Sequence, residues 1–333
     1  MIIVPKLPSK PKLRTIGVLT SGGDAPGMNA AIRAVVRWAD AHHVRTFGIR
    51  RGYTGILDRQ VELLTSRSVA NVIQRAGTFL KTSRCQAFLD SEHRARAAQI
   101  LRQWDIEGLV VIGGDGSLTG AQRLAEESGI AVIGVPGTID NDMGGTETTL
   151  GFDTAVNTAL DAIDKIRDTA DSHDRCFVVE VMGRSSGALA TSVGLAGGAE
   201  TILVPERETG IEEVIGNIDT SITRGRTNSI IVVAEGYQGG SGHDLTEQLN
   251  ARGYHARACI LGHIQRGGMP TAFDRNLGSV MGSAAAAHLT AGRSRQMVAM
   301  REGHIELVPI EEAVSGERLP LLNMLDLART LAT

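Results

Sequence analysis

The sequence predicts an α/β protein with mainly parallel sheets. Short apolar runs alternate with amphipathic segments along most of the 333 residues, and many of the 40 glycines directly follow an apolar run. Nearly continuous apolar strands are typical of parallel sheets that are covered on both faces, and strand–helix alternation is the pattern of βαβ units. The length suits two domains of roughly 100–200 residues each.

The first strand is expected at residues 15–20 (TIGVLT), followed by a helix over 27–43 with Pro26 in its first turn. A second strand follows at 44–50. The same alternation continues with strands and helices at 106–114, 117–128, 130–137, 175–183, 184–198, 200–205, 210–225, 228–236, 244–252, 256–262 and 274–291. No proline- or serine-rich linker divides the chain, so we expect two domains that share a cleft, with the chain crossing between them more than once.

Composition excludes several classes of protein. The net charge of −3 argues against a general nucleic-acid binder. No apolar run approaches the ~20 residues that span a bilayer. The cysteines, at 85, 176 and 259, form no CxxC pair, which favours reduced thiols in the cytoplasm over a disulfide framework. Residues 1–14 lack a signal-peptide core and are expected to form a mobile leader before the first strand.

Two glycine-rich loops follow predicted strands, at 20–27 (TSGGDAPG) and 112–120 (IGGDGSLTG). Neither matches the P-loop or the GxGxxG fingerprint. Even so, glycine before a helix lets backbone N–H groups approach an anion. Asp115 stands in the second loop, where a carboxylate suits Mg²⁺ bridging to phosphate oxygens. The alternative is a turn closed by an Asp side chain; the two loops together favour phosphate binding.

The segment 135–149 (VPGTIDNDMGGTETT) places Asp140 and Asp142 two residues apart among glycines and threonines. Transfer of a phosphoryl group to a hydroxyl needs a base for the hydroxyl proton and neutralisation of the transferred charge. One aspartate can accept the proton while the other helps Asp115 to orient a metal. An Asx-turn pair that caps the following helix remains the alternative.

Basic and polar groups end several later strands. Arg184, Arg257, Arg266 and His263 offer the charge-assisted donors that a phosphorylated substrate requires, and Glu235 could accept bonds from sugar hydroxyls. A single arginine at a strand end is usually a surface charge. Several in one chain, most of them beside glycine, favour a phosphosugar pocket.

Together, LTSGGDAPGMNAAIR, IGGDGS, PGTIDND, EVMGR and LGHIQRGG resemble phosphofructokinase, and most closely the short, ATP-dependent bacterial form. The resemblance covers nearly the whole chain from about Arg14. It implies a transferase of glycolysis, in the cytoplasm, that uses ATP and Mg²⁺ to convert fructose 6-phosphate to fructose 1,6-bisphosphate. It also implies two similar Rossmann-like, three-layer domains: a nucleotide-binding domain of 1–150 plus 263–313 and a sugar-phosphate-binding domain of 151–262 plus 314–333.

The resemblance assigns roles residue by residue. Asp140 matches the catalytic base, with Thr138, Asp142 and Arg184 beside it. The ATP site matches Gly23, Arg84, Cys85, Gly114, Asp115, Gly116 and Ser117, with Asp115 toward Mg²⁺. The sugar-phosphate site matches Thr138, Ile139, Asp140, Arg175, Met182, Gly183, Arg184, Glu235, Arg257, His263, Ile264, Gln265 and Arg266. Arg175 and Arg257 match arginines that reach a neighbouring subunit's substrate, which implies a homotetramer with shared active sites.

Two further questions depend on the resemblance. Pyrophosphate-using relatives carry an aspartate at the position of Gly116 and a lysine at that of Gly137, so the two glycines favour ATP. The alternatives are the same reaction with pyrophosphate and a catalytically silent nucleotide or phosphosugar sensor; an NAD-dependent oxidoreductase is disfavoured because GxGxxG is missing. An effector site for ADP or phosphoenolpyruvate would use Arg33, Arg37, Arg167, Glu200, Arg224 and Arg226, although Ser66 stands near where the family has an arginine.

Overall fold

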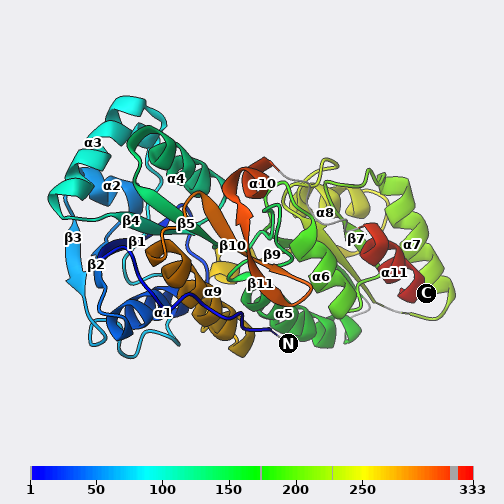
Figure 1. Ribbon diagram of the computed structural model, residues 1–333. Helices are drawn as coiled ribbons and strands as arrows, with labels where there is room; N and C mark the ends of the chain where they lie inside the picture. The colour runs from blue at the N-terminus through cyan, green and yellow to red at the C-terminus, as the bar shows by residue number, and fades with distance from the viewer. Residues whose placement is uncertain (1, 173–174, 227, 316–321, 333) are drawn as a thin grey trace. The chain divides into compact units, whose positions relative to one another are not determined.

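The computed structural model describes residues 2–172, 175–226, 228–315 and 322–332 (Figure 1). The chain forms two compact units. Unit 1 comprises Met1–Thr138, Met143–Asp153 and Arg266–Arg318, and unit 2 comprises Ile139–Asp142, Thr154–Gln265 and Leu319–Thr333. The expected domain segment 314–333 includes residues 316–321 and 333, which lie outside the described residues.

Unit 1 is built on a seven-stranded sheet with the order β11-β10-β5-β4-β1-β2-β3. The central strands run parallel, while β3 is antiparallel to β2 and β11 is antiparallel to β10. The strands are β1 (Thr15–Ser21), β2 (Arg45–Ile49), β3 (Val61–Leu64), β4 (Gly108–Gly113), β5 (Ala131–Pro136), β10 (Gln296–Arg301) and β11 (His304–Pro309). Every residue of β1 and β4 is buried, as expected for strands covered on both faces.

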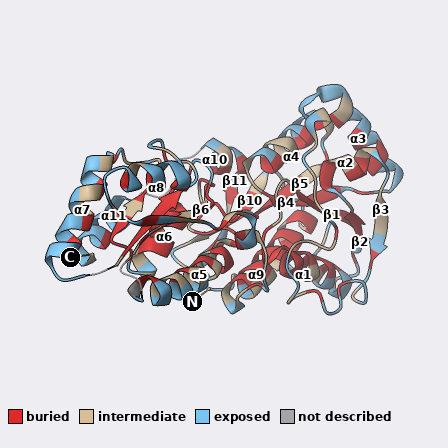
Figure 2. Cartoon of the chain, turned by 180° about the vertical axis from the view of Figure 1, so that it is seen from behind, coloured by how far each residue is buried: buried red, intermediate tan, exposed pale blue. Residues whose placement is uncertain are grey.

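Helices cover both faces of this sheet (Figures 1 and 2). The helices are α1 (Met28–Ala41), α2 (Gly52–Leu57), α3 (Ser91–Gln103), α4 (Asp115–Ser128), α9 (Ala272–Thr290) and α10 (Ile310–Ser315), with a 3₁₀ turn η1 at Gln86–Leu89. Helices α1 and α9 pack together at close range. An added Cβ at Gly282 would lie 2.4 Å from the carbonyl oxygen of Ala31, so only glycine permits this approach.

Unit 2 contains a four-stranded parallel sheet with the order β7-β8-β6-β9. Its strands are β6 (Cys176–Val181), β7 (Thr201–Leu203), β8 (Ser229–Ala234) and β9 (Ala256–Ile260). Its helices are α5 (Phe152–Asp171), α6 (Ala188–Ala196), α7 (Ile211–Thr223), α8 (Gly242–Asn250) and α11 (Leu322–Leu331), with a 3₁₀ turn η2 at Gly262–Arg266. Helices α7 and α8 bury their apolar faces against the sheet in one cluster, and α6 packs against β7, β8 and α11.

The predicted α/β class with parallel sheets is confirmed, and two of the features that were predicted differ in detail. Helix α4 begins at Asp115 and not at 117, because an acidic side chain in the first turn favours the positive end of the helix. The expected mobile leader is wrong in one respect, since its backbone is bonded to unit 1. Ile3 N–H donates to the carbonyl oxygen of Gly303 (2.8 Å), and Lys12 N–H to that of Thr290 (2.6 Å). Among the described helices, none has the length and apolar character needed to cross a bilayer.

Candidate active site

In unit 1 the loops after β1 and β4 begin side by side. The parallel register aligns Ser21, the last residue of β1, with Gly113, the last residue of β4. The chain leaves β1 toward β2 on one side and leaves β4 toward β5 on the other. The boundary between β1 and β4 is therefore a topological switch point, where open α/β sheets bind ligands at their carboxyl edge.

Glycine is required where these two loops touch. An added Cβ at Gly113 would lie 2.5 Å from the Ser21 carbonyl oxygen and 2.8 Å from Ser117 Oγ. Gly22 has a φ of +87°, which favours glycine, and its Cβ position is 3.3 Å from Ser117 Oγ. The loop after β1 thus lies against the first turn of α4, and the positive end of a helix suits an anion.

A third segment, residues 75–85, is bound to the same loop. Thr82 Oγ1 donates to the Gly22 carbonyl oxygen (2.9 Å), and Gly22 N–H donates to the Ser83 carbonyl oxygen (3.3 Å). Asn29, which is 1% exposed, donates to the Arg75 carbonyl oxygen and accepts from Phe79 N–H. These bonds bring Arg84 and Cys85 next to Gly22. The residues expected to bind ATP therefore all gather in unit 1.

Asp115 is the first residue of α4. Within the described part of the chain, no group of three or more His, Cys, Asp or Glu side chains could hold a metal ion. One carboxylate near an anion-binding loop does fit Mg²⁺, because that ion is usually held by one or two carboxylates together with substrate phosphates and water. The donor set thus fits a metal that arrives with a nucleotide and does not fit a resident metal cage.

In unit 2 the ends of β6, β8 and β9 converge. Beyond the strands, Glu235 N–H donates to the Val181 carbonyl oxygen (2.9 Å) and Leu261 N–H to that of Glu180 (3.0 Å). Side chains then connect the loops: Met182 N–H donates to Gln265 Oε1 (2.8 Å). Since β6 lies between β8 and β9, the loop at its end has support on both sides.

Arg184 has a special backbone conformation in that loop. Its φ is +50° and that of Gly183 is +138°, and its N–H donates to Glu235 Oε1 (2.6 Å). Its Nε lies 3.3 Å from Asp140 Oδ2; the Asp140 side chain is 2% exposed and that of Arg184 is 50% exposed. The two expected catalytic side chains therefore form an ion pair with one partner buried and the other open to solvent.

The other expected sugar-phosphate residues are more scattered. Arg257 is exposed on the edge strand β9, and its Nη1 donates to the Ala256 carbonyl oxygen (3.1 Å). His263 and Ile264 are exposed in η2, whereas Gln265 is fully buried. Arg175 is half-buried just before β6. Thr138 is in unit 1, where its carbonyl oxygen accepts from Thr149 Oγ1 (2.6 Å), while Ile139 and Asp142 are in unit 2.

Arg266 lies with the ATP group. A Cβ built on Gly23 would be 2.4 Å from Arg266 Nη1, so the guanidinium rests directly against the loop after β1 in unit 1. Its Nε is buried without a hydrogen-bond partner among the described residues. An arginine at an anion-binding glycine loop has the right charge and donors for a phosphate.

The expected effector residues fall into two groups. Arg33 and Arg37 lie one turn apart on α1, and burial together with the charge of Arg37 lowers the pKa of Arg33. In unit 2, Arg226 Nη1 pairs with Glu200 Oε1 (2.5 Å) and Arg167 Nη2 donates to the Gly197 carbonyl oxygen (2.5 Å). Arg224 is exposed at the end of α7.

Two supporting residues were missed by sequence reasoning. Tyr53, in α2, is 3% exposed, and its hydroxyl donates to the Ser117 carbonyl oxygen (2.5 Å) while its ring stacks on Phe88. Burial is the first cause that raises the pKa of Tyr53 far above its usual value, so the hydroxyl stays a donor. Asn29, within LTSGGDAPGMNAAIR, is the second. Both residues are recognisable by their burial and hydrogen bonds in the structure, and no feature of the sequence around them indicates their roles.

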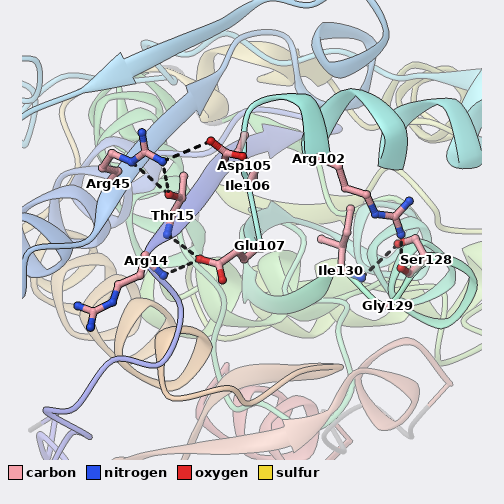
Figure 3. Close-up of a pocket in the computed structure, with 10 residues that line it drawn as sticks. All are labelled: Arg14, Thr15, Arg45, Arg102, Asp105, Ile106, Glu107, Ser128, Gly129 and Ile130. Atoms are coloured by element: carbon pink, nitrogen blue, oxygen red, sulfur yellow. Dashed lines mark hydrogen bonds and ion pairs between the residues drawn. The ribbon is translucent and has the colours of Figure 1, made fainter.

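A hollow of about 500 Å³ opens at the opposite, amino edge of the unit 1 sheet (Figure 3). Its polar groups are bonded to one another: Glu107 Oε2 accepts from Arg14 N–H (2.6 Å) and Thr15 N–H (3.0 Å), and Arg102 Nη2 donates to the Ser128 carbonyl oxygen (2.6 Å). These bonds fix the starts of β1 and β5. We therefore assign this hollow a structural role.

The chain is similar to known proteins. The family model for phosphofructokinase matches residues 15–289. The chain belongs to the phosphofructokinase family. It is 54% identical over 321 residues to the ATP-dependent 6-phosphofructokinase 1 of Thermus thermophilus, covering 96% of this chain and all of that protein. It is 51% identical over 308 residues to the ATP-dependent 6-phosphofructokinase of Clostridioides difficile, covering 92% and 96%.

Solved phosphofructokinases share the fold. The structure of phosphofructokinase from Saccharomyces cerevisiae matches with a TM-score of 0.86 and 34% identity, over 96% of this chain and 48% of that one. A pyrophosphate-dependent phosphofructokinase from Marinobacter aquaeolei matches with a TM-score of 0.82 over 93% and 86% of the two chains. At 24% identity this second likeness shows the fold alone.

Proposed function

We propose that the chain transfers the γ-phosphoryl group of ATP to the 1-hydroxyl of fructose 6-phosphate, the committed step of glycolysis. The observation that carries this proposal is the pair of Asp140 and Arg184: a buried carboxylate 3.3 Å from a half-exposed guanidinium. Membership of the phosphofructokinase family and relatives named ATP-dependent 6-phosphofructokinase support the donor and the reaction.

Asp140 acts as the general base. Its carboxylate accepts the proton of the 1-hydroxyl as that oxygen attacks the γ-phosphorus in line, and the proton stays on the carboxyl group until products leave. Arg184 lies beside the reacting groups and offsets negative charge as it moves between oxygens. Thr138, Ile139 and Asp142, on the same segment, orient the acceptor. Catalysis comes from positioning and electrostatics, because phosphoryl transfer asks the protein for little covalent chemistry.

The nucleotide is bound by the glycine loops of unit 1. Gly23 and the segment 114–116 offer backbone N–H groups to the phosphates, the Ser117 hydroxyl lies beside them, and Arg84 and Cys85 flank them. Asp115 would hold Mg²⁺, which would neutralise charge on the phosphate groups during transfer. Arg266, against Gly23, fits a phosphate contact of the same loop.

The sugar phosphate is recognised in unit 2. The hydrogen-bonded cluster around Arg184 consists of Met182, Gly183, Glu235 and Gln265. His263 and Ile264, which directly precede Gln265 in the sequence, are exposed. Arg175 and Arg257 reach the substrate of a neighbouring subunit in a homotetramer with shared sites. The exposure of Arg257 on the edge strand β9 supports this, since an edge strand is open to a second chain.

The effector residues are proposed to bind ADP or phosphoenolpyruvate. The like charges of Arg33 and Arg37 one turn apart are unfavourable in an isolated helix and favour a bound anion. The other residues proposed for effector binding are in unit 2: Arg167, Glu200, Arg224 and Arg226. Activity at subsaturating fructose 6-phosphate should respond to one of these ligands; a flat response to both would remove this part of the proposal.

The test of the reaction is a coupled assay for fructose 1,6-bisphosphate with Mg²⁺, run in parallel with ATP and with pyrophosphate. We expect turnover with ATP alone. Turnover with pyrophosphate would refute the donor assignment made from Gly116 and Gly137. Silence with both donors would refute the kinase and leave a nucleotide or phosphosugar sensor.

A further inference from the structure

The turn that carries Arg184 needs support from its surroundings. A left-handed backbone is unfavourable for a non-glycine residue, and Arg184 adopts it with a φ of +50° directly after Gly183 at +138°. Such conformations persist only where neighbouring groups fix them. The bonds that fix this turn therefore decide where the guanidinium points.

The start of the turn is held by residues already placed in the sugar-phosphate site. Gln265 Oε1 accepts from Met182 N–H (2.8 Å), and Glu235 Oε1 accepts from Arg184 N–H (2.6 Å). Within the turn, Ser186 N–H donates to the Gly183 carbonyl oxygen (2.9 Å). These bonds fix the entry to the turn. At its exit, Ala188 N–H donates to Ser186 Oγ (3.2 Å) within the turn itself, and a second support comes from outside it.

The exit is held by Glu206, from the loop after β7. Both of its carboxylate oxygens accept from Gly187 N–H, at 2.8 and 3.0 Å. Gly187 precedes α6 as its N-cap and has no side chain to cap that helix; Glu206 supplies a carboxylate there, which the helix dipole favours. A Cβ on Gly187 would lie 2.5 Å from Glu206 Oε2 and 2.5 Å from Val204 Cβ, so turn and loop are in direct contact.

We propose that Glu206 is a positioning residue for phosphoryl transfer: it fixes the exit of the Arg184 turn and so keeps Arg184 Nε 3.3 Å from Asp140 Oδ2. This inference rests on the proposed function. Without the carboxylate, Gly187 N–H turns to water, the turn relaxes toward the right-handed region, and the guanidinium leaves Asp140. The effect should fall on the sugar side of the reaction and not on the nucleotide side, whose residues are in unit 1.

Glu180 offers a matched control in the same unit. Its Oε2 accepts from Gly242 N–H (2.7 Å), where Gly242 is the first residue of α8. Glu180→Ala therefore removes the same kind of bond, a carboxylate on a glycine N–H at a helix start. In the described part of the chain, no hydrogen bond joins the Glu180 side chain to the Arg184 turn.

The experiment compares Glu206→Ala, Glu206→Gln and Glu180→Ala with the wild-type protein. Misplacing a catalytic group by about 1 Å costs on the order of 10²-fold, so we expect Glu206→Ala to lower kcat/KM for fructose 6-phosphate by about 10- to 100-fold with the KM for ATP unchanged. Glu206→Gln keeps one acceptor oxygen and should recover most of that loss. Glu180→Ala should match Glu206→Ala in its urea midpoint but keep wild-type kinetics. Equal kinetics for the two alanine variants would overturn the inference.

A double-mutant cycle with Arg184→Ala tests whether Glu206 acts through Arg184. If it does, Glu206→Ala costs almost nothing further once Arg184 is gone; an additive loss would mean that Glu206 acts on the fold in general. If Glu206→Ala fails to fold, Glu206→Asp is used in its place in the experiment, because aspartate has a side chain shorter by one methylene and so withdraws the carboxylate from Gly187. Crystal structures separate this inference from the proposed function, because a left-handed Arg184 in the variant would overturn it whether or not the wild-type protein turns over.

Discussion

Gly236 gives the sharpest test of the Arg184 site. It follows Glu235 at the end of β8, and a Cβ built on it would lie 1.9 Å from the Arg184 carbonyl oxygen and 3.0 Å from the carbonyl carbon. Real Cβ atoms essentially never come within 3.0 Å of a heavy atom outside their own residue and its chain neighbours. Gly236→Ala must therefore separate the two loops by about 1 Å, a displacement that costs on the order of 10²-fold when it moves a catalytic group.

The assay is kcat/KM for fructose 6-phosphate, with the urea midpoint measured in parallel. Overpacking of this kind costs about 1–3 kcal/mol of stability, which leaves a folded protein to assay. Gly216→Ala in α7 is the control, because its Cβ would meet no atom within 4 Å and alanine in a helix is worth up to about 1 kcal/mol over glycine. A folded Gly236→Ala protein with kcat/KM within about threefold of wild type would refute the reasoning, because that loss is far smaller than the expected loss on the order of 10²-fold.

Other expected outcomes follow from the same geometry. Asp140→Ser should lower kcat by about 10²–10⁴-fold with fructose 6-phosphate binding nearly intact, because a base acts in the transition state; equal losses in calorimetric binding and turnover would contradict that role. Gly116→Asp should fold normally and lose ATP activity, measured as kcat/KM for ATP. Arg257→Ala should chiefly raise the KM for fructose 6-phosphate; an unchanged KM would argue against a phosphate contact. Burial, and then the charge of Arg293, lower the pKa of His288 below its ordinary value. The unfolded chain therefore takes up that proton first as pH falls, and His288→Gln should flatten the loss of unfolding free energy as pH falls through the ordinary histidine pKa of about 6.5; an unchanged pH slope would contradict this.

Most of the fold was predictable because its signals are local. Buried parallel strands such as β1 and β4 are continuous apolar runs, and each is followed by glycine and an amphipathic helix. The hairpin of β10 and β11 was not predicted. Strand β10 pairs with β5, some 160 residues earlier in the chain, through Gln296 with Ile133 and Met297 with Gly134. Nothing near residue 296 indicates that partner, so local patterns could not place it.

The site was predictable to the extent that its chemistry lies in short segments. Asp140 and Arg184 stand out as charges among glycines at strand ends, and the structure pairs them. Their supports do not stand out. Glu206 is an acidic residue in a polar loop, and Tyr53 is an aromatic in a short helix; the side chain of each bonds to one backbone group elsewhere in the sequence. Whether such a bond forms depends on how segments from different parts of the chain pack together, and the sequence of one segment does not contain that information.

The two glycines that favour ATP carry unequal weight once packing is considered. A Cβ at Gly137 would lie 2.9 Å from Met28 Cε, the movable end of a side chain, and 3.2 Å from Ile112 Cγ2, so packing in unit 1 favours glycine there in part, whatever the donor. A Cβ at Gly116 would meet nothing within 4 Å, and its place in the first turn of α4 would stabilise an acidic side chain. The fold therefore permits aspartate at 116, and packing does not account for the glycine. An added carboxylate would repel a nucleotide phosphate at this helix start, and for this reason the proposed donor assignment depends more on Gly116 than on Gly137.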